Sequence, residues 1–238
     1  MKIAIIGYGK MGKEIEQVAL QRGHEVNLKI TSRNLDEMTK ENLQRCDVAI
    51  EFTRPDKAIE NINRCFEAQL PVVVGTTGWF DQLDQLKQQC ESTQNTMLYA
   101  SNCSLGVNIF FELNKKLAQL MKKQQDYQVN IAETHHTQKL DAPSGTAITL
   151  AEDLIENYST KKSWKNEWSD HEEVLPVISH RVENVPGTHV IKYSSPIDEI
   201  EIKHTAHNRK GFASGAVVAA EYIATKKGVF TMSDVLFG

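Results

Sequence analysis

The stretch "MKIAIIGYGKMGKEI" (residues 1–15) decides the fold, because it places a glycine loop between a strand and a helix. The apolar run Ile3–Ile6 is typical of a short buried strand, and apolar residues recur at helical spacing after the loop. Gly7, Gly9 and Gly12 form a G-x-G-x-x-G pattern. Such glycines permit a tight turn, the approach of backbone N–H groups to a pyrophosphate, and close packing of helix on strand. The stretch predicts a dinucleotide-binding unit; the alternative is a helix start that merely tolerates glycine.

The next ninety residues alternate strand-like and helical patterns. Further strands are expected at Val26–Thr31, Val48–Phe52, Pro71–Gly78 and Met97–Ser101, with amphipathic segments between them. This alternation predicts βαβ units and a parallel sheet with right-handed crossovers. "GTTG" (75–78) and "ASNC" (100–103) then stand at strand ends, where ligands of open α/β sheets bind.

The pattern changes beyond Asn102. A long helix is expected over 106–123, a strand at "YQVNIAET" (127–134), and a second helix at "TAITLAEDLIENY" (146–158). A polar segment, Ser159–Glu173, is expected to be a surface loop. Three strand-like pieces without intervening helices follow over 174–206, which is typical of an antiparallel meander. Residues 212–226 return to an apolar helix.

Composition places the chain among ordinary globular proteins. It has 238 residues, 40% of them hydrophobic and 24% charged, and a formal net charge of −4. There is no basic excess to neutralise nucleic-acid phosphates, no apolar run approaching the roughly 20 residues of a membrane span, and no secretory leader. The four cysteines lack CxxC spacing and are expected to be buried free thiols. We expect a cytoplasmic protein that binds neither nucleic acid nor membrane.

The end of the second strand, "KITSRN" (29–34), bears on cofactor choice. NAD-binding units carry an acid there that binds the ribose 2′-hydroxyl. Ser32 and Arg33 occupy these positions, and a guanidinium can bind a 2′-phosphate that a carboxylate would repel. The sequence favours NADPH over NADH; the alternative is that Arg33 only points into solvent.

A second informative stretch is "ETHHTQKLDAPSGTA" (133–147), with two adjacent histidines three residues before Lys139. A metal site is disfavoured, because adjacent strand residues point to opposite sides and no further ligand completes a known spacing. General acid–base catalysis is open, since imidazole titrates near neutrality. Anion binding is also open, by Lys139 with the N–H groups of Gly145 and Thr146 at a helix start. A capped helix beside solvated histidines is the structural alternative.

The pattern E-x-H-H-x-x-K-x-D-A-P-S-G-T-A in this stretch resembles the signature of the 4-hydroxy-tetrahydrodipicolinate reductase (dihydrodipicolinate reductase) family of lysine and diaminopimelate biosynthesis. The glycine loop, Gly75–Thr77, Ala100–Cys103 and "HNRKGFASGAV" (207–217) fall in the same order as in that family. The resemblance therefore covers nearly the whole chain.

The resemblance implies NAD(P)H-dependent reduction of 4-hydroxy-tetrahydrodipicolinate to tetrahydrodipicolinate with loss of water, with hydride reaching C4 of the ring. It implies that His135 is the proton donor and acceptor, and that Lys139 is a second proton donor that also holds substrate. His136 would contact a substrate carboxylate, as would the amides of Gly145 and Thr146.

The motifs and the resemblance together imply the cofactor contacts and the domains. The expected cofactor-binding residues are Gly7, Tyr8, Gly9, Lys10, Met11, Gly12, Arg33, Gly75, Thr76, Thr77, Ala100, Ser101, Asn102 and Cys103. We expect an α/β Rossmann-like dinucleotide-binding domain of residues 1–103, completed by 210–238. Residues 104–209 would form an α+β substrate-binding domain with a mostly antiparallel open sheet, through which a homotetramer assembles.

Two departures from the family pattern stand out. The family often carries an acid before the basic residue at the end of the second strand, where this chain has Ser32. Its R-x-G-x-x-x-G-x-H pattern reads "RVENVPGTH" (181–189) here, so that Glu183 replaces a glycine and Pro186 adds a rigid point. We expect a local change in the loop there. Two rival functions remain at this stage: another two-domain NAD(P)-dependent oxidoreductase, acting on an imine, and a non-catalytic dinucleotide sensor.

Overall fold

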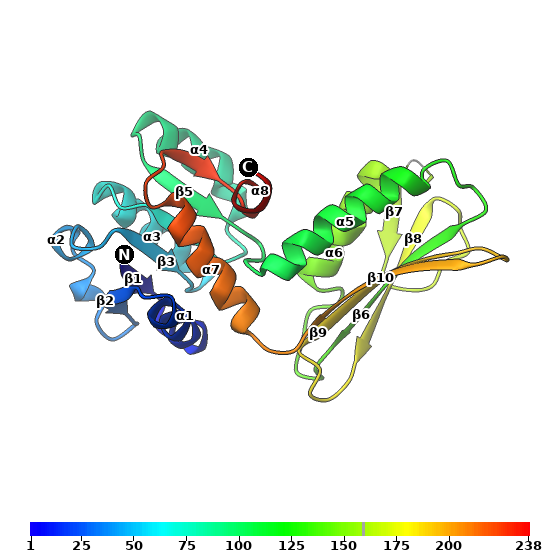
Figure 1. Ribbon diagram of the computed structural model, residues 1–238, viewed down its shortest axis with the longest axis horizontal. Coiled ribbons are helices and arrows are strands. Elements are labelled where there is room, and N and C mark those ends of the chain that lie inside the picture. Colours follow the sequence, from blue (N-terminus) through cyan, green and yellow to red (C-terminus); the bar gives the residue numbers. More distant parts are fainter. Residues whose placement is uncertain (159) are drawn as a thin grey trace. The chain divides into compact units, whose positions relative to one another are not determined.

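Six parallel strands form the first sheet, and the glycine loop follows the strand that comes first in the sequence (Figure 1). The computed structural model describes residues 1–158 and 160–238. The strand order is β11 (Gly228–Phe230), β5 (Thr96–Tyr99), β4 (Val72–Val74), β3 (Val48–Glu51), β1 (Lys2–Ile6) and β2 (Glu25–Ile30). The chain runs from β1 outward to β2, and then returns on the other side of β1 to β3. This change of direction places the ligand crevice of an open α/β sheet at the carboxyl ends of β1 and β3.

Helices cover both faces of this sheet (Figure 1). α1 (Lys10–Gln21) and α7 (Lys210–Ile223) pack on one face, and α3 (Pro55–Glu67) and α4 (Leu83–Ser92) pack on the other. The short helices α2 (Lys40–Leu43) and α8 (Met232–Phe237) complete the layers. All four residues of β3 are buried, as expected for a parallel strand covered on both sides. The expected α/β Rossmann-like domain is confirmed; the three-residue strand β11 was not expected from the sequence.

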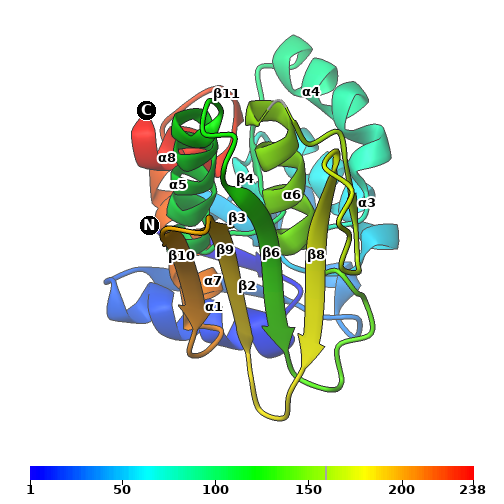
Figure 2. The same cartoon turned by 90° about the vertical axis from the view of Figure 1, so that its right-hand side faces the viewer.

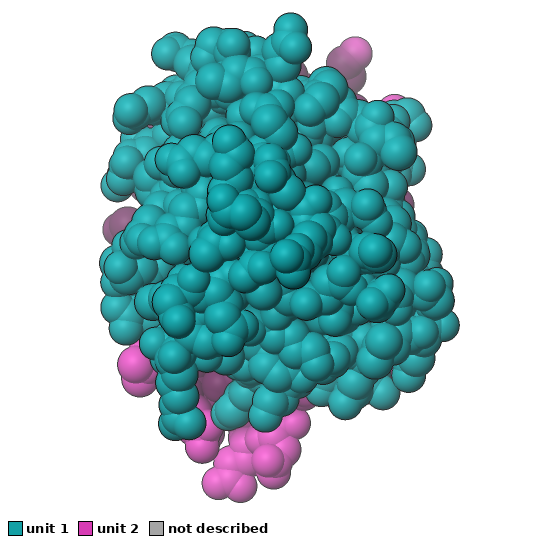
Figure 3. Space-filling model, turned by 90° about the vertical axis from the view of Figure 1, so that its left-hand side faces the viewer, with its two compact units in different colours: residues 1–105, 209–238 teal, residues 106–208 magenta. Residues whose placement is uncertain are grey.

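The chain divides into two compact units, residues 1–105 with 209–238, and residues 106–208 (Figure 3). The sheet of the second unit has the order β10 (Glu199–Ala206), β9 (Gly187–Ser194), β6 (Gln128–His135), β8 (Val174–Arg181) and β7 (Ser163–Lys165). Both α5 (Leu105–Met121) and α6 (Gly145–Asn157) lie on one face of it (Figure 2). Burial alternates along β6 and β9, because every second side chain points at these helices.

The expectation of a mostly antiparallel second sheet is wrong, because the sheet is mixed. β10 pairs with β9 and β9 with β6 in antiparallel fashion, but β6 pairs with β8, and β8 with β7, in parallel. The physical reason is α6, which follows β6 and returns the chain to the starting end before β7 and β8. A strand–helix–strand crossover produces parallel neighbours.

Three further expectations from the sequence can be compared with the structure. The segment expected to be a surface loop contains β7, while Ser159 lies outside the described residues. The four cysteines are free and buried. No helix within residues 1–158 or 160–238 combines the length and the apolar character needed to span a bilayer.

Candidate functional site

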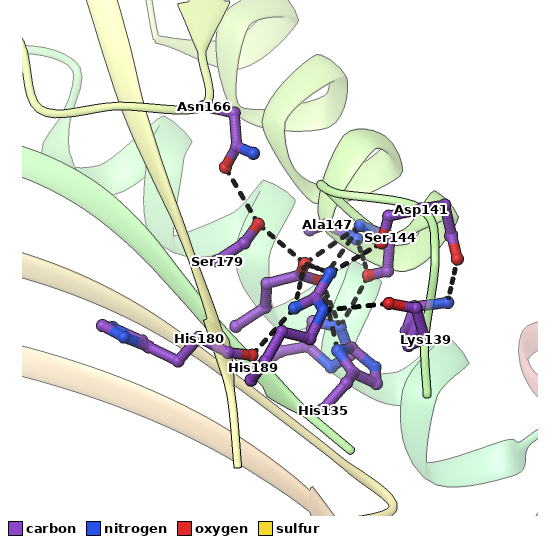
Figure 4. Close-up of polar contacts among 11 residues, drawn as sticks. His135, Lys139, Asp141, Ser144, Ala147, Asn166, Ser179, His180 and His189 are labelled. Atoms are coloured by element: carbon purple, nitrogen blue, oxygen red, sulfur yellow. Dashed lines mark hydrogen bonds and ion pairs between the residues drawn. The ribbon is translucent and has the colours of Figure 1, made fainter. Parts of the chain in front are cut away.

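Polar side chains gather where β6 ends (Figure 4). The helix-covered face of this strand begins with the apolar residues Val129 and Ile131 and continues with Glu133 and His135. The exposed fraction is 0% for Glu133 and 8% for His135. Because strand side chains alternate, a carboxylate and an imidazole two residues apart share one buried face. The adjacent His136 follows the strand and is half-buried.

The Glu133 carboxylate has three kinds of hydrogen-bond donor. Ser144 N lies 3.1 Å from each of its oxygens, and the Ser179 hydroxyl donates to Oε1 at 2.8 Å. Both Nη atoms of Arg181 lie 3.4 Å from Oε1. Burial works to raise the pKa of Glu133, but the hydrogen bonds from Ser144 and Ser179 oppose it, and the pKa is lowered. The carboxylate is therefore ionised at neutral pH.

Two imidazoles lie against this carboxylate. His135 Nδ1 is 3.4 Å and His189 Nε2 is 3.7 Å from Glu133 Oε2, and the rings meet edge to face with centroids 5.1 Å apart. Burial lowers the pKa of His135 despite the opposing charge of Glu133. Burial also lowers the pKa of His189, to about 4. Both rings are therefore neutral at neutral pH.

The start of α6 lies beside the cluster. Ser144 caps this helix: its Oγ accepts a hydrogen bond from Ala147 N at 3.2 Å and lies 3.2 Å from His189 Nε2. The next residues are an exposed Gly145 and a half-buried Thr146. An anion is stabilised at such an N-terminus, because the helix dipole places partial positive charge there.

Lys139 is held in the loop that joins β6 to α6. Its Nζ lies 2.9 Å from Asp141 Oδ1, which lowers the pKa of the aspartate against the effect of its partial burial. Arg181 donates to the carbonyls of Lys139 at 3.4 Å and Asp141 at 2.6 Å, and so fixes the loop that presents the ammonium. Figure 4 shows Lys139 and Asp141 at one edge of the cluster, joined by their ion pair.

The structure thus brings together two of the expected site residues, His135 and Lys139, and adds others that sequence reasoning missed. The missed residues are Glu133, Ser144, Ser179, Arg181 and His189. Two signals in the sequence could have pointed to three of these residues. Glu133 stands two residues before His135, a spacing that puts both side chains on one face of a strand, and the motif at 181–189 contains both Arg181 and His189. The departures Glu183 and Pro186 lie in the turn between β8 and β9.

Glu133, His135 and His189 also offer three potential metal-ligand atoms within 4.8 Å of one another. The carboxylate is already engaged by Ser144 and Ser179, and the guanidinium of Arg181 repels a cation at this position. The donor set therefore favours acid–base chemistry over metal binding, and the absence of a metal stays a prediction.

The glycine loop of the first unit has the geometry that a dinucleotide requires. Gly7 has a φ of +97°, and a Cβ there would lie 2.0 Å from the carbonyl oxygen of Phe52. A Cβ on Gly12 would lie 2.6 Å from Gly7 O, so close helix–strand packing needs glycine. A Cβ on Gly9 would meet nothing within 4 Å, which leaves its backbone open to a ligand. These are the three roles of the motif.

A second loop joins the glycine loop at the carboxyl edge of the sheet. A Cβ on Gly75 would lie 2.1 Å from the ring of Phe52, which also flanks Gly7. Thr53 N donates to Thr76 Oγ1 at 2.7 Å. The structure therefore places Gly75 and Thr76 beside the glycine loop through Phe52 and Thr53, two residues that sequence reasoning did not single out.

The turn after β2 presents Arg33 at the surface. Asn34 Oδ1 accepts from Thr31 N at 2.7 Å, and Arg33 N donates to Thr31 Oγ1 at 3.1 Å. The Arg33 guanidinium is exposed and makes no hydrogen bond or ion pair to any residue that the structure describes. Nearby, Glu16 accepts from the Tyr8 hydroxyl and pairs with Lys29, so this lysine is already neutralised.

Comparison with known proteins covers both units. The family description "Dihydrodipicolinate reductase, N-terminus" matches residues 1–103, and "Dihydrodipicolinate reductase, C-terminus" matches residues 106–236. A 4-hydroxy-tetrahydrodipicolinate reductase from Christiangramia forsetii is 50% identical, over 99% of this chain and 98% of that protein. One from Ralstonia pickettii is 33% identical, over 99% of each.

Solved structures share the fold. A dihydrodipicolinate reductase from Paenisporosarcina sp. TG-14, described as dipicolinate-bound, has a TM-score of 0.80 at 23% identity and covers 97% of both chains. An amine dehydrogenase from Mycobacterium smegmatis has a TM-score of 0.59 at 11% identity, over 98% of this chain and 95% of its own.

Proposed function

This chain belongs to the dihydrodipicolinate reductase family, and we propose that the cluster around Glu133 handles its substrate. The chain is an oxidoreductase that reduces 4-hydroxy-tetrahydrodipicolinate in lysine and diaminopimelate biosynthesis. The net reaction takes a hydride from NAD(P)H and a proton, and it yields tetrahydrodipicolinate, oxidised cofactor and water.

The carrying observation is the buried Glu133 carboxylate with His135 and the Lys139 loop around it. His135 is the group that exchanges a proton with the substrate, since a neutral imidazole accepts a proton and the resulting imidazolium releases it near neutrality. Lys139 donates a second proton and neutralises the dicarboxylate. His136 and the amides of Gly145 and Thr146 bind the substrate carboxylates, because a helix start beside an ammonium favours an anion.

The first unit carries the cofactor contacts. A bound nicotinamide cofactor supplies the hydride, and the openness above Gly9 fits a pyrophosphate there. The contacts extend along the glycine loop and the neighbouring strand ends, to Tyr8, Lys10, Met11, Thr77 and the segment 100–103. Because the Arg33 guanidinium is exposed and unpaired among the described residues, we assign it to the 2′-phosphate of NADPH, the preferred cofactor.

The second sheet supports assembly into a homotetramer. Its helix-free face carries an apolar row, because Ile178 and Val190 flank Ala132 in register across β8, β6 and β9. Such a row needs a partner surface to leave water. A second copy of the chain provides one. We propose that the enzyme works in the cytoplasm, as its four buried free thiols suit a reducing compartment.

A coupled assay tests this function. The aldol product of pyruvate and aspartate semialdehyde is generated enzymatically, and oxidation of NADH and of NADPH is followed separately. We expect oxidation of both, faster with NADPH at limiting concentration. Equal efficiency with the two cofactors would refute the role of Arg33. Oxidation of neither would refute the function and leave the dinucleotide sensor as the better interpretation.

A further inference from the structure

We infer that Glu133 is the positioning residue of this site: one buried carboxylate orients the proton-exchanging imidazole, the lysine loop and the anion-binding helix start together. The inference rests on the proposed function, because it names what holds that function's groups in place. Glu133 itself touches no reacting atom in this account.

The first contact orients His135. Glu133 Oε2 lies 3.4 Å from Nδ1 as an ion-pair contact and not a hydrogen bond, and that buried nitrogen has no hydrogen-bond partner among the described residues. A carboxylate at Nδ1 favours the tautomer that carries the proton there, and so leaves Nε2 free to exchange a proton. Nε2 points at the backbone of Gly187, where a Cβ would come within 3.1 Å of it.

The second contact reaches Lys139 through Arg181. The guanidinium lies 3.4 Å from Glu133 Oε1 and also donates to the carbonyls of Lys139 and Asp141. Arg181 thus links the buried carboxylate of Glu133 to the loop that carries Lys139, because its guanidinium contacts both. Removing the charge of Glu133 would leave a partly buried guanidinium without its counter-ion.

The third contact fixes the start of α6. Ser144 N donates to both oxygens of Glu133 at 3.1 Å, which anchors the residue that precedes Gly145 and Thr146. Ser144 and Glu133 both contact His189, whose burial keeps it neutral. Residues of β8, of β9 and of the start of α6 therefore all contact this one carboxylate.

The charges facing His135 determine what removal of Glu133 should do. The charged groups are Glu133 on β6, Lys139 and Asp141 in the following loop, and Arg181 on β8. The neutral ring of His189 on β9 also packs against His135. Glu133 raises the pKa of His135, whereas burial and the two cations lower it. Glu133→Gln should therefore move the titration of His135 to lower pH.

The experiment compares three variants of the full-length protein with the wild type. Glu133→Gln keeps the size but not the charge, Glu133→Asp keeps the charge on a shorter arm, and Glu152→Gln makes the same change at an exposed position on α6. We expect kcat/KM to fall about 100-fold in Glu133→Gln, with kcat carrying most of the loss. Glu133→Asp should recover part of it, and Glu152→Gln should match the wild type.

Two readouts separate positioning from general damage. Nitrogen-15 NMR of the histidines in the substrate-free protein should show His135 as the Nδ1–H tautomer in the wild type and Glu133→Asp, but not in Glu133→Gln. The acid limb of the kcat/KM profile should shift to lower pH in Glu133→Gln. An unchanged tautomer together with an unshifted profile would overturn the inference. If the wild type fails to turn over the dipicolinate precursor, the proposed function fails, while the tautomer still decides the role of Glu133.

Discussion

Replacing Gly187 by alanine tests whether His135 Nε2 is the working nitrogen. The added Cβ would lie 3.1 Å from Nε2 and 3.3 Å from Cδ2 of the same ring. Both distances are a few tenths of an ångström too short, and the His135 side chain is only 10% exposed and packs against His189 and Glu133, so it has little room to yield. The methyl group therefore crowds the atom that exchanges the proton and displaces it from the orientation that Glu133 favours.

The expected cost falls on turnover more than on folding. Crowding destabilises by about 1–3 kcal/mol, but an alanine in place of glycine at a permitted φ returns about 0.4–1 kcal/mol, so the net loss is about 1 kcal/mol. A displacement of a few tenths of an ångström at the reacting nitrogen should lower kcat/KM by about tenfold. Steady-state kinetics and urea unfolding of Gly187→Ala measure the two effects separately.

A double-mutant cycle assigns the effect to His135. If Gly187→Ala acts through the imidazole, then His135→Gln with Gly187→Ala should be no slower than His135→Gln alone, because the affected group is already absent. Additive losses in the double variant would refute the reasoning, and so would wild-type turnover in Gly187→Ala.

Three further predictions concern the buried histidine and the cofactor loop. His189 has its pKa lowered from 6.5 to about 4, so its neutral form stabilises the fold above pH 6.5, and this contribution, up to about 3 kcal/mol, is lost as the pH falls towards 4; His189→Gln should flatten the acid dependence of the unfolding free energy by that amount, and an unchanged slope would contradict it. Arg33→Ala should weaken NADPH binding about tenfold in fluorescence titration while NADH binding stays constant, because one charge-assisted contact to the 2′-phosphate is lost; equal weakening of both would argue for a structural role. Gly12→Ala should abolish binding of either cofactor, because its Cβ would lie 2.6 Å from Gly7 O and push the helix start away; tight binding with an intact circular dichroism spectrum would show that this packing is dispensable.

The first unit could be predicted from sequence because its signals are local. The glycine spacing predicts a tight turn at Gly7 and close helix–strand packing at Gly12, and the observed contacts of both residues match these roles. The strand β11 gave no such signal, since three residues are too few to show a period. Its place in the sheet depends on pairing with β5, more than 100 residues away in sequence.

The second unit shows where local reasoning ends. His135 and Lys139 were identified from a single stretch, but their surroundings depend on strand register. Glu133 lies opposite His189 on β9, and His135 lies opposite Arg181 on β8. Neither pairing follows from one sequence. The mixed sheet could have been foreseen, because a helix between two strands favours parallel pairing, and the antiparallel expectation gave that helix too little weight.

The most direct measurement compares wild type, His135→Gln and Lys139→Met under the same conditions, with turnover of the dipicolinate precursor and NADPH affinity recorded on each protein. Both side chains belong to the second unit, whereas the glycine loop belongs to the first, so NADPH affinity should stay constant. The account predicts that turnover falls at least about 100-fold in each variant, because a proton-transfer group is lost. Wild-type turnover in both variants, with NADPH still bound, would contradict it.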